Sequence, residues 1–250
     1  MIVFITGATA GFGLTIARTF AKDGAKIVGT GRRKDRLDSL HSELGDTFLP
    51  LAFDVGNRSQ VEEAIASLPT AFAEVDILVN NAGGAIGLDP AQNADLDDWD
   101  AMIASNVNGV VYCTRLLLPG MLERSRGHII NLGSVAAEWP YPGGNVYGAA
   151  KAFVHQFSNN LRADLFGTAI RVTDIQPGLV GGTEFSEVRF KGDMQRAKAV
   201  YEGTQPLLPE DVADAVYWAA TRPAHVNINS IQLMPVSQAY GPLPVKRQSS

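Results

Sequence analysis

The fold is decided by the stretch Ile2-Val3-Phe4-Ile5-Thr6-Gly7-Ala8-Thr9-Ala10-Gly11-Phe12-Gly13. An apolar strand over Ile2–Thr6 leads into a turn with three glycines, and helical spacing follows over Leu14–Lys22, where Ile16 and Phe20 share a face. Glycines let backbone N–H groups approach a pyrophosphate, and a helix N-terminus adds partial positive charge. The spacing is G-x-x-x-G-x-G, which alone is weak evidence. Its place between a strand and a helix favours a phosphate-binding turn over a plain one.

Short apolar runs alternate with helical segments along the rest of the chain. Further strands are expected at residues 26–29, 48–53, 77–79, 128–132, 171–175 and 231–236. Further helices are expected at residues 35–44, 60–67, 97–124 (bent or interrupted near Pro119), 146–165 and 209–220. Strands that alternate with helices form βαβ units, so the sequence predicts an α/β fold with a doubly wound parallel sheet and helices on both faces.

Two segments fit no regular element. Residues 178–205 begin at the carboxyl end of a strand, where ligands bind in doubly wound sheets, so we expect them to form a lid. Residues 239–250 form a polar tail that we expect to be loosely held. No composition shift marks a second domain, and a single domain over 1–250 is expected.

Composition limits the classes of protein that the chain can represent. The formal net charge of -5 argues against a general nucleic-acid binder, which would carry a basic face. The single cysteine, Cys113, cannot form an intrachain disulfide, and its apolar neighbours predict a buried structural thiol. No apolar run reaches about eighteen residues and no basic segment precedes the apolar start, so neither a membrane span nor a signal peptide is expected. These features favour a cytoplasmic globular protein.

The end of the second expected strand distinguishes NAD from NADP. NAD enzymes usually place an Asp or Glu there for the ribose hydroxyls. This chain instead reads Gly29-Thr30-Gly31-Arg32-Arg33, and two guanidinium groups suit a 2′-phosphate dianion. A solvated basic helix start is the simpler explanation, but basic residues there oppose the helix dipole unless an anion compensates. We therefore expect Arg32 and Arg33 to bind NADP.

Two further groups of polar residues follow strands. Asp54-Val55 lies after the third strand and Asn80-Asn81-Ala82-Gly83 after the fourth, so both lie at the ligand edge of the sheet. Because Asp, Asn and Gly are common turn formers, turn chemistry alone would explain either group.

Four residues in the middle of the chain, Asn106, Ser134, Tyr147 and Lys151, suggest proton transfer. Ser134 follows the fifth strand, and Tyr147 and Lys151 lie one helical turn apart on the next helix. A lysine ammonium and an oxidised nicotinamide would both lower the pKa of the tyrosine from about 10, which makes Tyr147 a general acid or base. Ser134 could hydrogen-bond the substrate oxygen, and Asn106 could hold a water in line with Lys151.

With these residues in this order, the chain resembles the short-chain dehydrogenase/reductase family over essentially its whole length. The matching pieces are Thr6–Gly13, Asp54, Asn80–Gly83, Asn106, Ser134, Tyr147, Lys151 and Pro177-Gly178. The resemblance implies a Rossmann-type sheet of about seven strands, a Ser-Tyr-Lys-Asn tetrad, transfer at the pro-S face of nicotinamide and a homotetramer. It assigns cofactor contacts to Gly7, Ala8, Thr9, Ala10, Gly11, Phe12, Gly13, Asp54, Val55, Asn81, Ala82, Gly83, Tyr147, Lys151, Pro177, Gly178, Val180 and Thr183.

Residues 143–149, 177–185 and 222–229 resemble one group within that family, the bacterial NADP-dependent 3-hydroxy acid dehydrogenases, also described as serine or L-allo-threonine dehydrogenases. That similarity implies an oxidoreductase acting on serine, L-allo-threonine or 3-hydroxypropionate, or reducing malonic semialdehyde. Two alternatives stay open: a family reductase of another ketone or aldehyde, and an NADP-binding sensor without turnover. The complete tetrad speaks against a sensor, because binding needs no proton relay.

A hydroxy acid requires a cation for its carboxylate. Arg189 and Lys191 in the expected lid are the candidates, although an exposed basic stretch is the simpler explanation. Ser134 and Tyr147 are the other expected substrate contacts. No His/Cys/Asp cluster has metal-ligand spacing, so no metal is expected. His128 and His155 have no partner that the sequence identifies.

Overall fold

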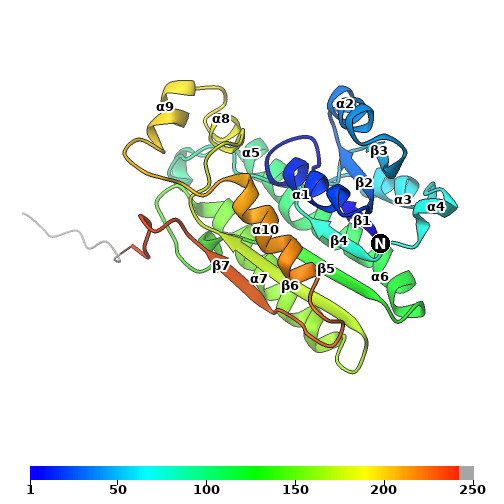
Figure 1. Ribbon diagram of the computed structural model, residues 1–250. Helices are drawn as coiled ribbons and strands as arrows, with labels where there is room; N and C mark the ends of the chain where they lie inside the picture. The colour runs from blue at the N-terminus through cyan, green and yellow to red at the C-terminus, as the bar shows by residue number, and fades with distance from the viewer. Residues whose placement is uncertain (242–250) are drawn as a thin grey trace, which may run out of the picture.

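The structure is a computed structural model that describes residues 1–241. Its centre is a seven-stranded sheet in the order β3-β2-β1-β4-β5-β6-β7, in which every pair is parallel (Figure 1). The strands are β1 (Ile2–Ile5), β2 (Lys26–Gly31), β3 (Phe48–Ala52), β4 (Ile77–Asn80), β5 (Gly127–Leu132), β6 (Ile170–Pro177) and β7 (Ser230–Leu233). The strand order reverses between β1 and β4, which is where such sheets bind ligands. The predicted fold class is confirmed.

Helices cover both faces of the sheet (Figure 1). One face carries α1 (Gly11–Lys22), α2 (Lys34–Leu44) and α10 (Pro209–Ala220), whose apolar residues form one core cluster with the strands. The other face carries α3 (Arg58–Ala66), α4 (Thr70–Ala73), α6 (Gly109–Glu123) and α7 (Asn145–Asp164), which form a second cluster. The alternating sequence pattern anticipated this arrangement, and the predicted boundaries lie within three residues of the observed ones.

The predicted helix over residues 97–124 is interrupted at a different place from the one expected. It consists of α5 (Leu96–Ile103), a π-helical segment over Ala104–Asn108, and α6, and Pro119 lies inside α6 without ending it. The interruption has a local cause. The Asn106 side chain donates a hydrogen bond to the backbone carbonyl of Met102, four residues earlier, which is an oxygen that a regular α-helix would use.

The same stretch, Leu96–Glu123, is long and apolar enough to cross a membrane by length and composition alone. Core helices of globular proteins pass this test too. Here α6 packs on the sheet, and Cys113, Leu117 and Met121 are buried in the second core cluster, which accounts for the apolar composition. The expected burial of Cys113 is confirmed, and burial raises the pKa of its thiol to about 12.

The predicted lid segment is not irregular throughout, which corrects the expectation for residues 178–205. It contains α8 (Phe185–Arg189) and α9 (Met194–Ala199). Both helices are too short for hydrophobic periodicity to reveal them. Asp193 begins α9 by accepting a hydrogen bond from the Arg196 backbone N–H, a capping contact of ordinary kind. Most of the predicted tail, residues 242–250, lies outside the described residues.

Candidate active site

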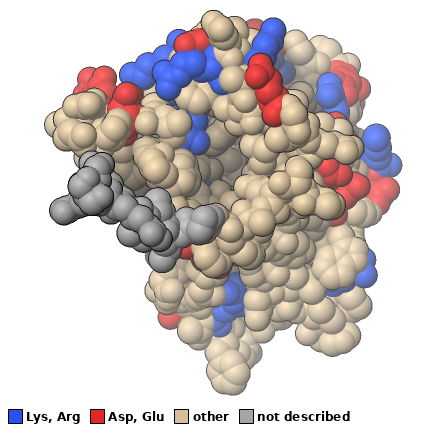
Figure 2. Space-filling model, turned by 90° about the vertical axis from the view of Figure 1, so that its left-hand side faces the viewer, with Lys and Arg blue, Asp and Glu red and all other residues tan. Residues whose placement is uncertain are grey.

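A cavity of about 460 Å³ opens at the carboxyl ends of the strands. Figure 2 looks at this edge and shows a hollow with Lys and Arg side chains gathered along its upper rim. Fifteen predicted site residues line it: Gly7, Thr9, Ala10, Gly11, Phe12, Arg32, Arg33, Asp54, Val55, Asn81, Ala82, Gly83, Tyr147, Lys151 and Thr183. The sequence analysis missed other lining residues, notably Gly84, Ser105, Glu184, Phe185 and Val188.

The glycine turn forms the floor of the cavity below α1. Gly7 and Gly11 have φ angles of 71° and 51°, which favour glycine. A Cβ on Gly13 would lie 2.2 Å from the Gly7 carbonyl oxygen, so only glycine allows the turn to close onto α1. Asn81 holds the turn from β4, because its side-chain amide donates to the carbonyls of Thr6 and Gly7 at 2.8 and 3.1 Å. These contacts hold the backbone of the turn in place.

Arginine side chains lie beside the turn at the end of β2. The Arg33 guanidinium donates to the Thr9 hydroxyl at 3.1 Å and to the Glu184 carboxylate at 2.8 Å. Arg36 contacts the other oxygen of Glu184 at 2.7 Å, and Arg32 lines the cavity without a side-chain hydrogen bond or ion pair among residues 1–241. The sequence analysis missed Glu184 and Arg36, because Glu184 lies 151 residues from Arg33 along the chain.

Tyr147 and Lys151 lie across the cavity from these arginines, on α7. Both are buried, and the Lys151 ammonium lies 5.8 Å from the centre of the Tyr147 ring. The Lys151 Nζ donates to the carbonyl of Leu132, the last residue of β5, at 2.8 Å. Burial lowers the pKa of Lys151 to about 8, and the charge of Asp174 opposes that change.

The pKa of Tyr147 differs from the sequence-based expectation. Burial raises it to about 12, and the nearby Tyr141 adds to the increase, while a hydrogen bond with Ser134 and the charge of Arg189 lower it. The expected decrease did not allow for desolvation of the phenolate. Tyr147 is therefore a neutral proton donor near pH 7 unless further positive charge reaches it.

The remaining tetrad residues lie close to this pair. Ser134 is buried directly after Gly133, which lines the cavity, and its hydroxyl accepts from the Ala136 N–H at 3.1 Å. Asn106 is fully buried and donates to the Gly84 carbonyl at 2.9 Å. Its side-chain oxygen is buried without a hydrogen-bond partner among residues 1–241, and a Cβ on Gly83 would lie 2.4 Å from it. That oxygen can therefore accept a hydrogen bond.

The segment predicted to be a lid contacts the tyrosine. Phe185 of α8 packs edge-on against Tyr147, with 5.8 Å between ring centres. Arg189 donates to the Tyr141 hydroxyl at 2.9 Å and to the Gly87 carbonyl at 3.3 Å. Lys191 is exposed, does not line the cavity, and lies 2.7 Å from the Asp98 carboxylate. Arg189 does not line the cavity either, but its charge reaches Tyr147, whereas Lys191 is paired with acidic residues.

Several predicted cofactor residues support the cavity without lining it. Ala8 is fully buried behind the turn, and its N–H donates to the Thr30 carbonyl at 2.8 Å. Pro177, Gly178 and Val180 carry the chain from β6 into the lid, where Gly178 donates to the Leu233 carbonyl at 2.8 Å and Val180 bridges Leu207. Within residues 1–241 no group of three or more His, Cys, Asp or Glu could hold a metal ion.

The dimensions of this site suit a phosphorylated dinucleotide. The arginines follow β2 and the Tyr147–Lys151 pair lies at the end of β5, three strand positions away, or about 14 Å at the usual strand spacing. The glycine turn lies between them at the end of β1. Cationic groups, a backbone phosphate cradle and a proton donor are thus arranged in one line along the cavity.

Comparison with known proteins agrees with this geometry. The profile of one family, described as short chain dehydrogenase, matches residues 1–193. The chain belongs to the short-chain dehydrogenase family. It is accordingly an oxidoreductase, and the resemblance inferred from its motifs is confirmed.

Relatives of this dehydrogenase have more specific names. The NADP-dependent 3-hydroxy acid dehydrogenase YdfG of Salmonella typhi is 60% identical over 247 residues, which cover 99% of this chain and all of that protein. Serine 3-dehydrogenase of Agrobacterium fabrum is 47% identical over 247 residues, covering 99% of this chain and 98% of that protein. A solved structure described as the closed form of serine dehydrogenase complexed with NADP+ is 60% identical, covers 99% of this chain and 100% of its own, and has a TM-score of 0.98.

Proposed function

We propose that this dehydrogenase transfers a hydride between NADP and the 3-hydroxyl or 3-oxo carbon of a short 3-hydroxy acid or β-hydroxy amino acid. Serine, L-allo-threonine and the pair 3-hydroxypropionate and malonic semialdehyde are the candidate substrates. One observation carries the proposal: Tyr147 and Lys151 line the same cavity as Arg32 and Arg33. The relatives named for NADP-dependent 3-hydroxy acid and serine oxidation support it.

The residues of this chain have separate tasks in that reaction. Bound NADP supplies the hydride acceptor and, when oxidised, a positive charge close to Tyr147. Tyr147 then accepts the substrate hydroxyl proton as the C–H hydride leaves, and Lys151 stabilises the phenolate form in which Tyr147 can do so. Ser134 donates a hydrogen bond to the substrate oxygen. Asn106 accepts from a water that links Lys151 to solvent.

Arg189 is the proposed partner of the substrate carboxylate. Its guanidinium is held by Tyr141 and Gly87, and its charge reaches Tyr147, whose pKa it lowers. A fixed, partly buried guanidinium binds a carboxylate through two N–H donors. Lys191 remains the weaker candidate because Asp98 and Asp95 already accompany it.

The other assignments are proposals of the same kind. A single NADP-binding domain over 1–250 would use residues 178–205 as its lid, with Thr183 beside the glycine turn and with Pro177, Gly178 and Val180 as further cofactor contacts. A cytoplasmic homotetramer is the expected form, with neither a membrane nor a nucleic acid as partner.

A substrate panel tests the proposal directly. Purified protein is given NADP+ with L-serine, L-allo-threonine or 3-hydroxypropionate, and NADPH formation is followed by absorbance. We expect turnover with at least one of these substrates and much weaker turnover with NAD+. Turnover of unrelated alcohols alone would assign the chain to another reductase group. NADP binding without any turnover would favour the sensor.

A further inference from the structure

Four polar side chains lie along one face of α7, beginning with Tyr147 and Lys151. Tyr147, Lys151, His155 and Asn159 follow at intervals of four residues, so they share one face of the helix. This face packs against β5 and β6. The proposed chemistry uses Tyr147 and Lys151. It assigns no role to His155 or Asn159.

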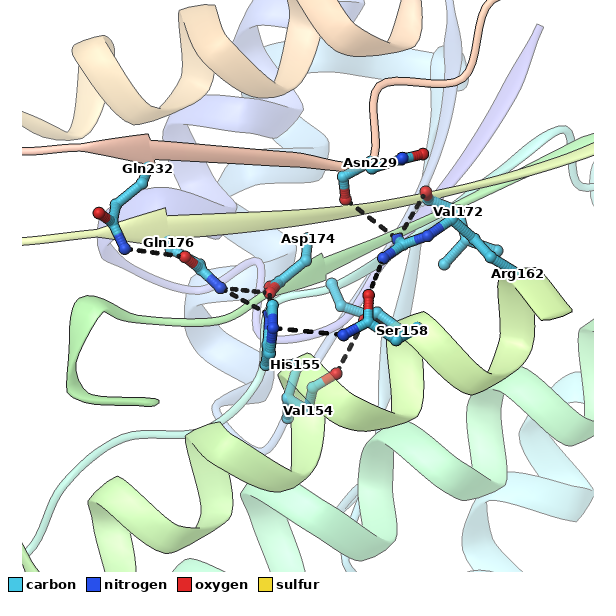
Figure 3. A network of polar contacts seen from close by, with 11 residues as sticks. Val154, His155, Ser158, Arg162, Val172, Asp174, Gln176, Asn229 and Gln232 are labelled. Atoms are coloured by element: carbon cyan, nitrogen blue, oxygen red, sulfur yellow. Dashed lines mark hydrogen bonds and ion pairs between the residues drawn. The ribbon is translucent and has the colours of Figure 1, made fainter. Parts of the chain in front are cut away.

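Asp174 of β6 meets this line inside the protein. It is completely buried, and one carboxylate oxygen, Oδ2, lies 2.8 Å from His155 Nδ1 and 2.8 Å from Gln176 Nε2 (Figure 3). Asn159 Nδ2 lies 3.2 Å from His155 Nε2. Gln176 Nε2 also lies 2.7 Å from His155 Nδ1, so Asp174, His155, Gln176 and Asn159 form one connected polar cluster. Two side-chain nitrogens thus hold one oxygen of the carboxylate in place.

The second oxygen of Asp174 lies at the end of β5. Oδ1 is buried without a hydrogen-bond partner among residues 1–241. It lies against Gly133, where a Cβ would be only 2.3 Å away. Gly133 directly follows Leu132, whose carbonyl accepts the hydrogen bond from Lys151 Nζ at 2.8 Å. A bare carboxylate oxygen thus lies beside the backbone that holds the ammonium group.

We propose that Asp174, held by His155 and Gln176, is a positioning residue whose negative charge keeps Lys151 protonated while Tyr147 exchanges its proton. A buried lysine loses its charge readily, and a neutral lysine cannot stabilise a phenolate. Asp174 is the charged group that opposes the effect of burial on the pKa of Lys151. We expect its influence on the tyrosine to pass through the lysine. This inference rests on the proposed role of Tyr147.

Few other charges face this pair. Burial, helped by Arg171, lowers the pKa of His128 on β5 to about 3, so that imidazole is neutral at working pH. On α5, Asp98 is paired with Lys191. The remaining ionisable groups on the packed elements are His155, Arg162 and Asp164 of α7, Arg171 of β6, and Asp97 and Asp100 of α5.

The test is the pH dependence of kcat/KM for alcohol oxidation in Asp174→Asn, which keeps the shape of the side chain and removes its charge. Because Lys151 is protonated at low pH with or without Asp174, we expect the two profiles to coincide at low pH and the variant to begin losing activity about one pH unit earlier than wild type as pH rises. Ser158→Ala is the matched control, because Ser158 is fully buried in the same region but uncharged. Its profile should keep the wild-type midpoint. If Asp174→Asn does not fold, Asp174→Ser carries the same expectation.

A substrate-free measurement separates this inference from the proposed function. Tyrosinate absorbance is titrated in NADP+-saturated protein, and the Tyr147→Phe signal is subtracted to isolate one of the six tyrosines. Ionisation of Tyr147 should occur at higher pH in Asp174→Asn than in wild type, whatever substrate the enzyme uses. An unchanged midpoint, or an equal loss of activity at every pH, would overturn the role of Asp174.

Discussion

Arg33 joins three parts of the chain that lie far apart in sequence: its own strand end, Thr9 of the glycine turn and Glu184 at the start of the lid. The arginine itself could be predicted, because a guanidinium replaces the carboxylate that NAD enzymes use at this position. Its partner Glu184 could not. Ion pairs across 151 residues leave no local pattern in a single sequence.

Loss of Arg32 or of Arg33 should weaken NADP binding and leave NAD binding nearly unchanged. Each charge-assisted phosphate contact is worth about 1.5–3 kcal/mol, so Arg32→Ala and Arg33→Ala should each raise the Kd for NADP about ten- to a hundredfold. Calorimetric titration with both cofactors measures this. Lys34→Ala is the control, because Lys34 is exposed and paired with Asp38. If the double variant of Arg32 and Arg33 still prefers NADP over NAD as strongly as wild type, these arginines do not bind the 2′-phosphate.

At the scale of elements, periodicity predicted long helices and strands well and short or irregular ones poorly. The π segment at Ala104–Asn108 depends on an Asn106 side chain that reaches Gly84 and Met102, and no spacing rule encodes such contacts. The short α8 depends on contacts of the same kind, including the mutual hydrogen bonds of Gly87 and Arg189. Both elements border the cavity, so the least predictable elements are those that shape the site.

The lid helix provides a second prediction. Arg189→Ala should raise the KM for 3-hydroxy acids about tenfold or more, because it removes the proposed carboxylate partner, and should change the KM for a neutral alcohol of similar size much less. Steady-state kinetics with both substrate types measures the difference. Lys191→Ala, on the same segment but already paired with Asp98, should leave both values near wild type. Equal losses with acidic and neutral substrates would mean that Arg189 only supports lid folding.

For the whole molecule, alternation of strands and helices was sufficient to predict a doubly wound sheet, because parallel strands require crossover helices. The sheet order then brings together residues from β1, β2, β4, β5 and the lid at one edge. The sequence alone could not predict how deeply individual polar atoms are buried. Desolvation determines the pKa values of Tyr147 and Lys151, and it depends on packing from every side.

Burial also predicts how stability depends on pH. The pKa of His128 is about 3 in the folded protein, because of burial and then Arg171, against about 6.5 in an unfolded chain. As pH falls below 6.5 the unfolded state binds a proton that the native state does not, so folding weakens. Between pH 6.5 and 5 the wild type should lose about 1.5 kcal/mol more unfolding free energy than His128→Gln. Urea unfolding at both pH values measures this, and parallel losses in the two proteins would refute it.

The most direct test of the account compares wild type with Tyr147→Phe, which keeps the ring and its packing on Phe185 but has no transferable proton. NADP+ affinity is measured by titration, and NADPH formation from L-serine or 3-hydroxypropionate by absorbance. The account predicts unchanged folding and nearly unchanged NADP+ affinity, with turnover reduced about a hundredfold or more. A folded Tyr147→Phe protein that binds NADP+ and turns over at close to the wild-type rate would contradict it.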